Sequence, residues 1–388
     1  MPDVAITACE SYDPAECRKA LDRILTAVGG LDFVKEGTKI AIKTNLVAGI
    51  KPEKAATTHP AMLCALADIL TEKGAKAVVG DSPGGIYTSV YVNRIYSIAG
   101  VKAVEQHGAK LNRNFEQSAA KFPDAKIAKE FCYTSYLDEA DYIINFCKLK
   151  THGMMGMSAG AKNMFGVVPG TIKPEYHYKY PNPLDFANMI VDLNDYFKPV
   201  LTICDAVEGM EGNGPTAGTP RKIGAVIASK SPHNLDLLCA KLIGYKKEDV
   251  PTLTAAYDRG YIPESCEMLD IEGDYTKFIV SGYKKVNSNR SVEFLSDSGS
   301  FAGRLAGKAV SRALRSRPAL KKAECVGCQE CYRVCPARAI TMINKKPVIN
   351  RSQCISCFCC QEFCPKGAMK VKRTVIARII GGKNKNNT

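Results

Sequence analysis

Short apolar runs alternate with longer amphipathic stretches over the first 300 residues. The apolar runs predict strands at residues 39–43, 75–81, 141–150, 199–206 and 222–229. Helical patterns, several with proline in the first turn and glycine at the end, predict helices at residues 14–30, 59–74, 183–197 and 231–244. This alternation is typical of an α/β fold, and we expect a mostly parallel sheet with helices on both faces.

Cysteines near the C-terminus follow a rhythm that occurs twice. The first run is Cys325-x2-Cys328-x2-Cys331-x3-Cys335-Pro, and the same spacing returns from Cys354 to Cys364. In such runs three cysteines bind one [4Fe-4S] cluster and the fourth reaches the other cluster. The spacing therefore predicts two [4Fe-4S] clusters, cluster 1 held by Cys325, Cys328, Cys331 and Cys364, and cluster 2 held by Cys354, Cys357, Cys360 and Cys335.

A zinc ribbon is the alternative to two clusters, because it also uses Cys-x2-Cys pairs. Zinc takes four ligands per ion, which does not explain why each of the two runs has a third cysteine at the same spacing and a Cys-Pro pair. Cys359 is a ninth thiol in this region, and we interpret it as a small apolar side chain beside the cluster. Paired clusters favour single-electron transfer. The alternative is that they only stabilise a small domain.

The pattern predicts four segments. An α/β main domain at 1–300 precedes a basic linker helix at 301–322 that ends near a proline, a small ferredoxin-like α+β domain at 323–372 and a basic tail at 373–388. Within the small domain, residues 339–350 predict a hairpin around a Lys-Lys-Pro turn.

Composition and charge narrow the class of protein. The 388 residues are 46% hydrophobic and carry a formal charge of +14, which resides in the C-terminal part: residues 301–388 hold 19 Lys and Arg against three Asp and Glu. No motif of a nucleic-acid reader accompanies this charge, which disfavours nucleic-acid binding. The N-terminus does not resemble an export signal and no apolar run is long enough for a transmembrane segment, so we expect a cytoplasmic protein whose 17 cysteines are reduced or bind metal.

Polar residues follow the predicted strands of the main domain, where ligands bind in open α/β sheets. The candidate substrate-binding residues are Lys43, Asn45, Asp81, Lys148, Lys162, Asn163, Asp205, Glu208 and Glu211. The candidate catalytic residues are His59, Lys150 and His152. The cations favour a small anion such as a carboxylate or phosphate, and the histidines suit proton transfer. Asp205, Glu208 and Glu211 could hold a metal or move protons, while any further cofactor stays unspecified.

Two glycine-rich loops, at residues 158–170 and 208–220, predict a substrate cradle or lid, although both could be tight turns alone. Neither loop has the spacing of the known nucleotide-binding loops.

The segments "IKTNLV", "TTHP", "GDSPGG", "KLKTHGMMGMSAGAKNMFGVVPG" and "DAVEGMEGNGPTAG" occur in this order before the paired cysteine motif. Together they resemble domain-of-unknown-function family 362 over about the first 300 residues. The resemblance implies an iron–sulfur protein of anaerobic or microaerobic prokaryotes whose reaction is not assigned. The loop from Lys162 to Gly170 is also similar to the cofactor-holding Gly-Lys-Pro-Gly loop of lactate racemases, but the histidine pattern of those enzymes is missing.

We therefore expect a ferredoxin-coupled oxidoreductase that receives electrons from a redox partner protein, namely a ferredoxin, flavodoxin or reductase, and reduces a small anionic substrate or cofactor. Two alternatives remain: a non-catalytic electron carrier or assembly factor that docks a partner protein, and a hydrolase or isomerase with structural clusters.

Overall fold

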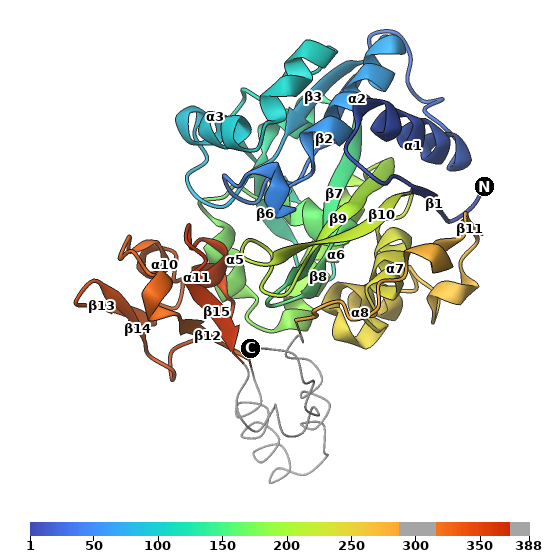
Figure 1. The fold of residues 1–388 in the computed structure, drawn as a ribbon. Coiled ribbons are helices and arrows are strands. Elements are labelled where there is room, and N and C mark those ends of the chain that lie inside the picture. The colour runs from blue at the N-terminus through green and yellow to red at the C-terminus, as the bar shows by residue number, and fades with distance from the viewer. Residues whose placement is uncertain (287–315, 373–388) are drawn as a thin grey trace.

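One large mixed sheet organises the main domain. The computed structural model describes residues 1–286 and 316–372, and within them this sheet has nine strands in the order β11-β1-β10-β9-β7-β2-β3-β4, with β8 paired to β7 (Figure 1). These strands are β1 (Val4–Ala8), β2 (Lys39–Lys43), β3 (Lys76–Gly80), β4 (Lys110–Leu111), β7 (Tyr142–His152), β8 (Gly156–Ser158), β9 (Leu201–Glu211), β10 (Thr219–Ser229) and β11 (Ile271–Glu272).

The centre of the sheet is parallel, as the sequence predicts. Strands β4, β3, β2, β7 and β9 pair with one another in parallel. Strand β10 runs antiparallel to both β9 and β1. The loop between β9 and β10 is short, and a parallel connection needs a dozen or more residues, so this pair forms a hairpin instead.

Helices cover both faces of the sheet. They are α1 (Pro14–Ala27), α2 (Pro60–Glu72), α3 (Ser89–Ile98), α4 (Gly160–Asn163), α5 (Lys173–Lys179), α6 (Pro183–Phe197), α7 (Pro232–Leu242) and α8 (Pro251–Asp258). Side chains of β10 alternate between two cores: Val226 packs with residues of α1 and α2, and Ile227 packs with residues of α7. The predicted strands and helices of the main domain are thus confirmed, with ends that differ by a few residues.

A separate two-stranded sheet of the main domain pairs β5 (Gln117–Lys121) with β6 (Glu130–Thr134). Its aromatic side chains extend the core under α6, where Phe131 packs edge-on against Tyr196.

The C-terminal module is built from two similar halves (Figure 1). The first half holds β12 (Arg317–Leu320), α10 (Glu330–Arg333) and β13 (Ile340–Ile343), and the second holds β14 (Lys346–Ile349), α11 (Cys359–Glu362) and β15 (Met369–Lys372). All three elements of the second half follow their counterparts at one constant offset, the same offset that separates Cys354 from Cys325. Strand β12 pairs with β15 and β13 pairs with β14, both antiparallel, so the halves are interleaved.

Two predictions for this region need correction. The prediction of a linker helix at 301–322 is wrong at its C-terminal end, because Arg317–Leu320 is a strand that pairs with β15. Residues 301–315 of the predicted helix and the tail at 373–388 lie outside the described residues. The hairpin is confirmed, but its turn is formed by Asn344 and Lys345, which both have positive φ, and Pro347 lies within β14.

None of the helices in the described parts of the chain has the length and apolar character needed to cross a bilayer.

Candidate functional site

Two cavities in the C-terminal module are lined by cysteines, four in the first and five in the second. The first is lined by Cys325, Cys328, Cys331 and Cys364. The second is lined by Cys335, Cys354, Cys357 and Cys360, and Cys359 also contributes to its wall. These are the two crossed sets that the spacing predicts, with three cysteines from one half and one from the other.

The local backbone suits a [4Fe-4S] cluster in each cavity. The amide of Ala339 donates to Cys335 Sγ at 3.2 Å, and at the equivalent place in the second half the amide of Ala368 donates to Cys364 Sγ at the same distance. Such N–H···S bonds stabilise cluster thiolates and tune their potential. Within the described residues, no group of three or more His, Cys, Asp or Glu side chains is placed so that it could hold a single metal ion.

At the carboxyl ends of β2 and β3, Lys43 forms a fully buried ion pair with Asp81, with Nζ 2.7 Å from Oδ1. Asn163 accepts a hydrogen bond from Asn45 at 2.7 Å and donates to the carbonyl of Lys43. A Cβ added at Gly166 would lie 2.4 Å from both Lys43 Nζ and Asp81 Oδ1. This glycine of the 158–170 loop therefore makes room for the ion pair, in which two predicted substrate-binding residues bind each other.

Lys148 and Asp205 form a second buried pair, 2.9 Å apart, between β7 and β9. Tyr12 accepts a hydrogen bond from Lys148 at 2.6 Å and donates to Asp205. Its ring stacks on His59 with 3.5 Å between centroids. Burial lowers the pKa of His59 to about 4, and its Nδ1 accepts from the Ala61 amide at the start of α2. His59 is thus a neutral helix cap in this network.

Lys150 is fully buried, and its hydrogen-bond acceptors among the described residues are both neutral. Its Nζ donates to Asn45 Oδ1 and to the carbonyl of Ala56, both at 2.6 Å. Burial lowers its pKa to about 7. A neutral amine has two N–H groups, which these acceptors satisfy, and one lone pair that can take up a proton.

His152 connects the main domain to the C-terminal module. Its Nδ1 accepts from the amides of Met154 and Met155, both at 3.2 Å, so the ring proton lies on Nε2. Nε2 is 3.0 Å from Oε1 of Glu362, at the end of α11. Burial acts to raise the pKa of Glu362, but His152 and the Lys162 ammonium outweigh it and hold this pKa at about 2. We refer to this contact as the His152–Glu362 pair.

Three further cationic or titratable side chains lie around Phe165, and we call them the cationic cluster: Lys162, Lys173 and His177. Lys162 Nζ lies 4.6 Å and Lys173 Nζ 5.6 Å from the centroid of the Phe165 ring, and His177 packs edge-on against the same ring. Burial lowers the pKa of Lys162, while Glu362 opposes that shift. Among the described residues Lys162 has no hydrogen-bond or ion-pair partner, and the buried Nδ1 of His177 has none either.

The second half of the module is seated beside this cluster. Phe358 is buried in the same core as Phe165. Gln361, fully buried, donates to the carbonyls of Asn213 and Gly214 at 2.9 and 3.0 Å, and the amide of Val371 donates to Asn213 Oδ1. The 208–220 loop, predicted to be a substrate cradle or lid, therefore binds the module.

The structure separates the predicted site residues into groups. It brings together Lys43, Asn45, Asp81, Lys150 and Asn163, and places Lys148, Asp205 and His59 in the neighbouring network. The three acids do not form a metal site in the described residues: Asp205 pairs with Lys148, and Glu211 accepts from the Lys284 amide, while Glu208 is only partly buried.

Sequence reasoning missed Tyr12, Lys173, His177 and Glu362. Tyr12 precedes α1 and Lys173 is the first residue of α5, so neither follows a strand, and Glu362 lies among the cysteines of the second run. The one available signal was that Glu362 is one of only three acids in residues 301–388.

Comparisons with known proteins agree with these two parts of the chain. Residues 40–241 match the family described as "Domain of unknown function (DUF362)", and residues 317–365 match "4Fe-4S dicluster domain". "Thylakoid-associated protein sll1697" from Synechocystis sp. is 30% identical over 272 residues, which cover 68% of this chain and 82% of that protein. The lactate racemase apoprotein from Thermoanaerobacterium thermosaccharolyticum aligns with a TM-score of 0.40 and 12% identity over 63% of this chain and 57% of the racemase.

Proposed function

The chain belongs to the DUF362 family and carries a 4Fe-4S dicluster domain, and from this premise we propose that it is an electron-transfer oxidoreductase with two [4Fe-4S] clusters that reduces a small anionic substrate or cofactor in its main domain. Cys325, Cys328, Cys331 and Cys364 would hold cluster 1, and Cys335, Cys354, Cys357 and Cys360 would hold cluster 2. When bound, such clusters supply single electrons at low potential.

The observation that carries the proposal is the His152–Glu362 pair. Glu362 lies two residues after Cys360, a predicted ligand, and contacts a histidine at the end of the central strand β7. Phe358 and Gln361 of the same segment are 1% and 0% exposed, so solvent does not reach these two side chains of the junction. The predicted cluster-2 ligands Cys357 and Cys360 thus belong to the same segment as the contact with the main domain, which supports short-range electron delivery.

Within this junction we assign anion binding to the cationic cluster. Lys43 and Lys148 are already paired with carboxylates, so their charges are balanced before any ligand binds. Lys162 has no carboxylate partner among the described residues. A buried ammonium without such a partner is stabilised most by binding an anion. His177 and Lys173 beside it would complete the set.

Lys150 is the residue we assign to proton transfer. Its pKa of about 7 allows it to carry or release a proton near neutral pH. His152 and His59, both predicted from the sequence to move protons, would instead position neighbouring groups, because their Nδ1 atoms accept backbone N–H groups.

The experiment is anaerobic reoxidation of the chemically reduced, cluster-loaded protein by a panel of small carboxylates and phosphates, followed by visible absorbance. We expect Lys162→Met to slow reoxidation by the active anion at least about tenfold, the effect of one charge-assisted contact, without changing the cluster spectrum. Lys222→Met is the matched control, since Lys222 is an exposed lysine paired with Glu10. The assignment is wrong if no anion reoxidises the protein or if the two variants behave alike.

One observation favours the alternative of a non-catalytic electron carrier or assembly factor. Lys43, Lys148 and Lys150 all have internal partners, as in a purely structural core. On that alternative, reduced protein would pass electrons to another protein and to none of the anions. The cytoplasmic location also stays a prediction, and the relative's name associates that protein with thylakoids.

A further inference from the structure

The two halves of the C-terminal module present equivalent faces in different surroundings. In the second half, Phe358 and Gln361 are 1% and 0% exposed because this face is seated on the main domain. The equivalent positions of the first half are Gln329 and Tyr332, and both are exposed, Tyr332 by 51%. A face that buries a protein surface in one half is therefore open in the other.

This open side of the module carries Cys328, a predicted ligand of cluster 1, and we define the cluster-1 face by exposed residues near it in the chain: Val326, Cys328, Tyr332, Arg333, Ile343 and Lys345. Val326 and Ile343 are 61% and 56% exposed, and Cys328 is the one exposed thiol among the described cysteines. A Cβ on Gly327 would lie 2.8 Å from the carbonyl oxygen of Lys345, which shows that the hairpin turn packs against the cysteine loop. Apolar side chains and cations thus adjoin a predicted cluster ligand.

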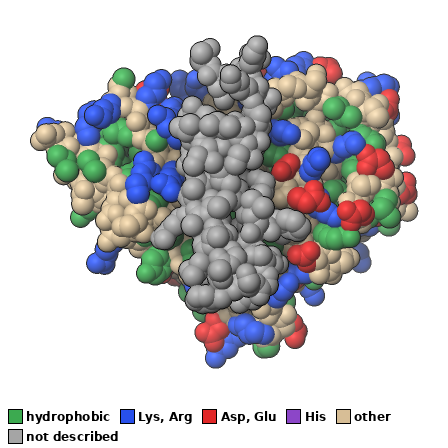
Figure 2. All heavy atoms as spheres, turned by 90° about the horizontal axis from the view of Figure 1, so that it is seen from below, with side chains coloured by type: hydrophobic (Ala, Val, Ile, Leu, Met, Phe, Trp, Pro, Cys, Tyr) green, Lys and Arg blue, Asp and Glu red, His purple; other side chains and the backbone are tan. Residues whose placement is uncertain are grey.

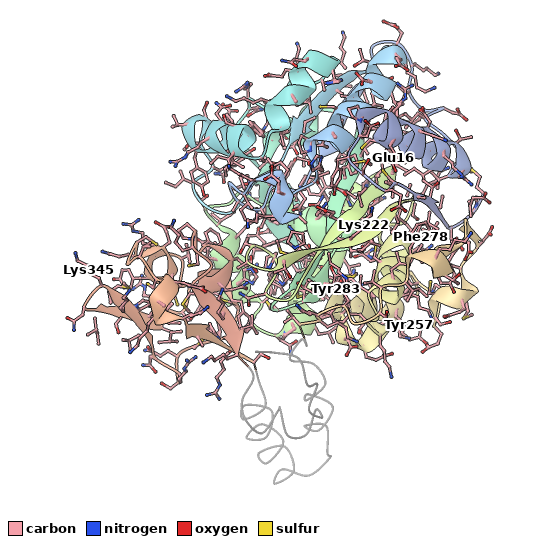
Figure 3. The ribbon with its side chains drawn as sticks, in the orientation of Figure 1. Glu16, Lys222, Tyr257, Phe278, Tyr283 and Lys345 are labelled. Carbon is pink, nitrogen blue, oxygen red and sulfur yellow. The ribbon has the colours of Figure 1, made fainter. Side chains whose placement is uncertain are left out.

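The module that carries this face has a positive formal charge from its Lys and Arg side chains. Residues 316–372 contain 11 Lys and Arg against three Asp and Glu, and one of those acids is Glu362, buried at the junction. Figure 2 shows Lys and Arg side chains, with few acidic ones, on the side of the molecule that holds the module. Lys345 lies at the end of the module that points away from the main domain (Figure 3).

We propose that the cluster-1 face is the docking site of a small acidic one-electron carrier protein, an inference that rests on the proposed electron-transfer function. Charge complementarity selects an acidic partner, and exposed Val326, Tyr332 and Ile343 supply the apolar contact at its centre. The reduced carrier loses one electron, the chain gains it, and no covalent bond or proton is transferred. Docking over exposed Cys328 brings the carrier to the predicted ligands of cluster 1, while the other half of the module faces the main domain.

A membrane surface is a poorer match to this face. Binding to a bilayer in this way needs a long amphipathic helix or a large apolar area, and α10 has four residues. The equivalent face on α11 already shows that this geometry packs against protein, through a buried aromatic side chain and side chain-to-backbone hydrogen bonds.

The test measures binding of a plant-type [2Fe-2S] ferredoxin, as a representative acidic carrier, to the cluster-loaded full chain. Arg333→Glu/Lys345→Glu reverses two charges of the face, and Tyr332→Ala removes its aromatic side chain. The matched control, Lys35→Glu/Lys73→Glu, reverses two charges of the main domain. All variants are first checked for wild-type iron content and visible spectrum.

We expect the Kd to rise at least about tenfold for the double reversal and several-fold for Tyr332→Ala, with the control within about twofold of wild type. Equal Kd values for the face and control variants would overturn the proposal. The proposal would also be overturned if the protein bound anionic phosphatidylglycerol vesicles through the same residues and did not bind ferredoxin. Because the Kd is measured without turnover, loss of docking is distinguishable from failure of the proposed substrate reduction.

Discussion

Replacing Glu362 with glutamine removes one charge from the junction while keeping the shape of the side chain. The Glu362 carboxylate is 14% exposed, so water screens it little, and its pKa of about 2 lies well below the ordinary value of about 4.3. At 1.36 kcal/mol per pKa unit, the charge contributes about 3 kcal/mol to the folded, docked state at neutral pH. Because the folded pKa is depressed, this contribution is fully present above about pH 4.5 and is lost as the pH falls toward 2.

We expect the loss to appear at the junction first. The amide of Val371 donates to Asn213 Oδ1 across the junction, so its hydrogen exchange reports undocking of the module. For about 2–3 kcal/mol, its exchange at neutral pH should accelerate roughly 30- to 150-fold in Glu362→Gln.

The matched control is Glu330→Gln, because Glu330 is a partly exposed acid on the equivalent helix α10 and its one ion-pair partner among the described residues is exposed Arg333. Its exchange at Val371 should stay within a few-fold of wild type. If both variants exchange at the same rate, the His152–Glu362 pair does not hold the module and the reasoning from its pKa is refuted.

Three further changes test other parts of the structure. Cys335→Ser should lose about four irons per chain and Cys359→Ser about none, as measured by metal analysis, and equal losses would refute the ligand sets. Gly166→Ala should lower the Tm by several degrees, because the added Cβ would lie 2.4 Å from the buried Lys43–Asp81 ion pair. The control is Gly49→Ala, whose Cβ would lie nearest to the end of the Ile98 side chain, at 3.1 Å. Similar Tm values for the two variants would contradict this. Burial lowers the pKa of Lys150 to about 7, so above that pH the unfolded chain binds more protons than the folded chain. Between pH 7.5 and 9, the free energy of unfolding of the wild type, measured by chemical denaturation, should therefore rise relative to that of Lys150→Met by up to about 2 kcal/mol. Parallel curves of stability against pH would contradict the lowered pKa.

The fold follows closely from local signals. Prolines at helix starts and apolar runs locate α1, α2, α6, α7 and the central strands to within a few residues. The antiparallel direction of β10 and the strand at Arg317–Leu320 were not predictable, because both depend on pairing with distant segments, and Pro318 suggested a helix end rather than an edge strand.

The site was predicted less completely. The cysteine spacing identifies both sets of cavity-lining thiols, since ligand geometry is encoded in adjacent residues. Position at strand ends brings Lys43, Asn45 and Lys150 together, but it cannot show that carboxylates and carbonyls already satisfy them. Glu362 reaches His152 only through docking of the module, a contact between segments far apart in the chain that no local pattern contains.

The most direct test of the account is the iron and acid-labile sulfide content of the protein purified or reconstituted without air. We predict about eight irons and eight sulfides per chain, because each of two cavities is lined by all four cysteines of one predicted [4Fe-4S] ligand set. A colourless protein that holds zinc, or a brown one that saturates at about four irons, would contradict it.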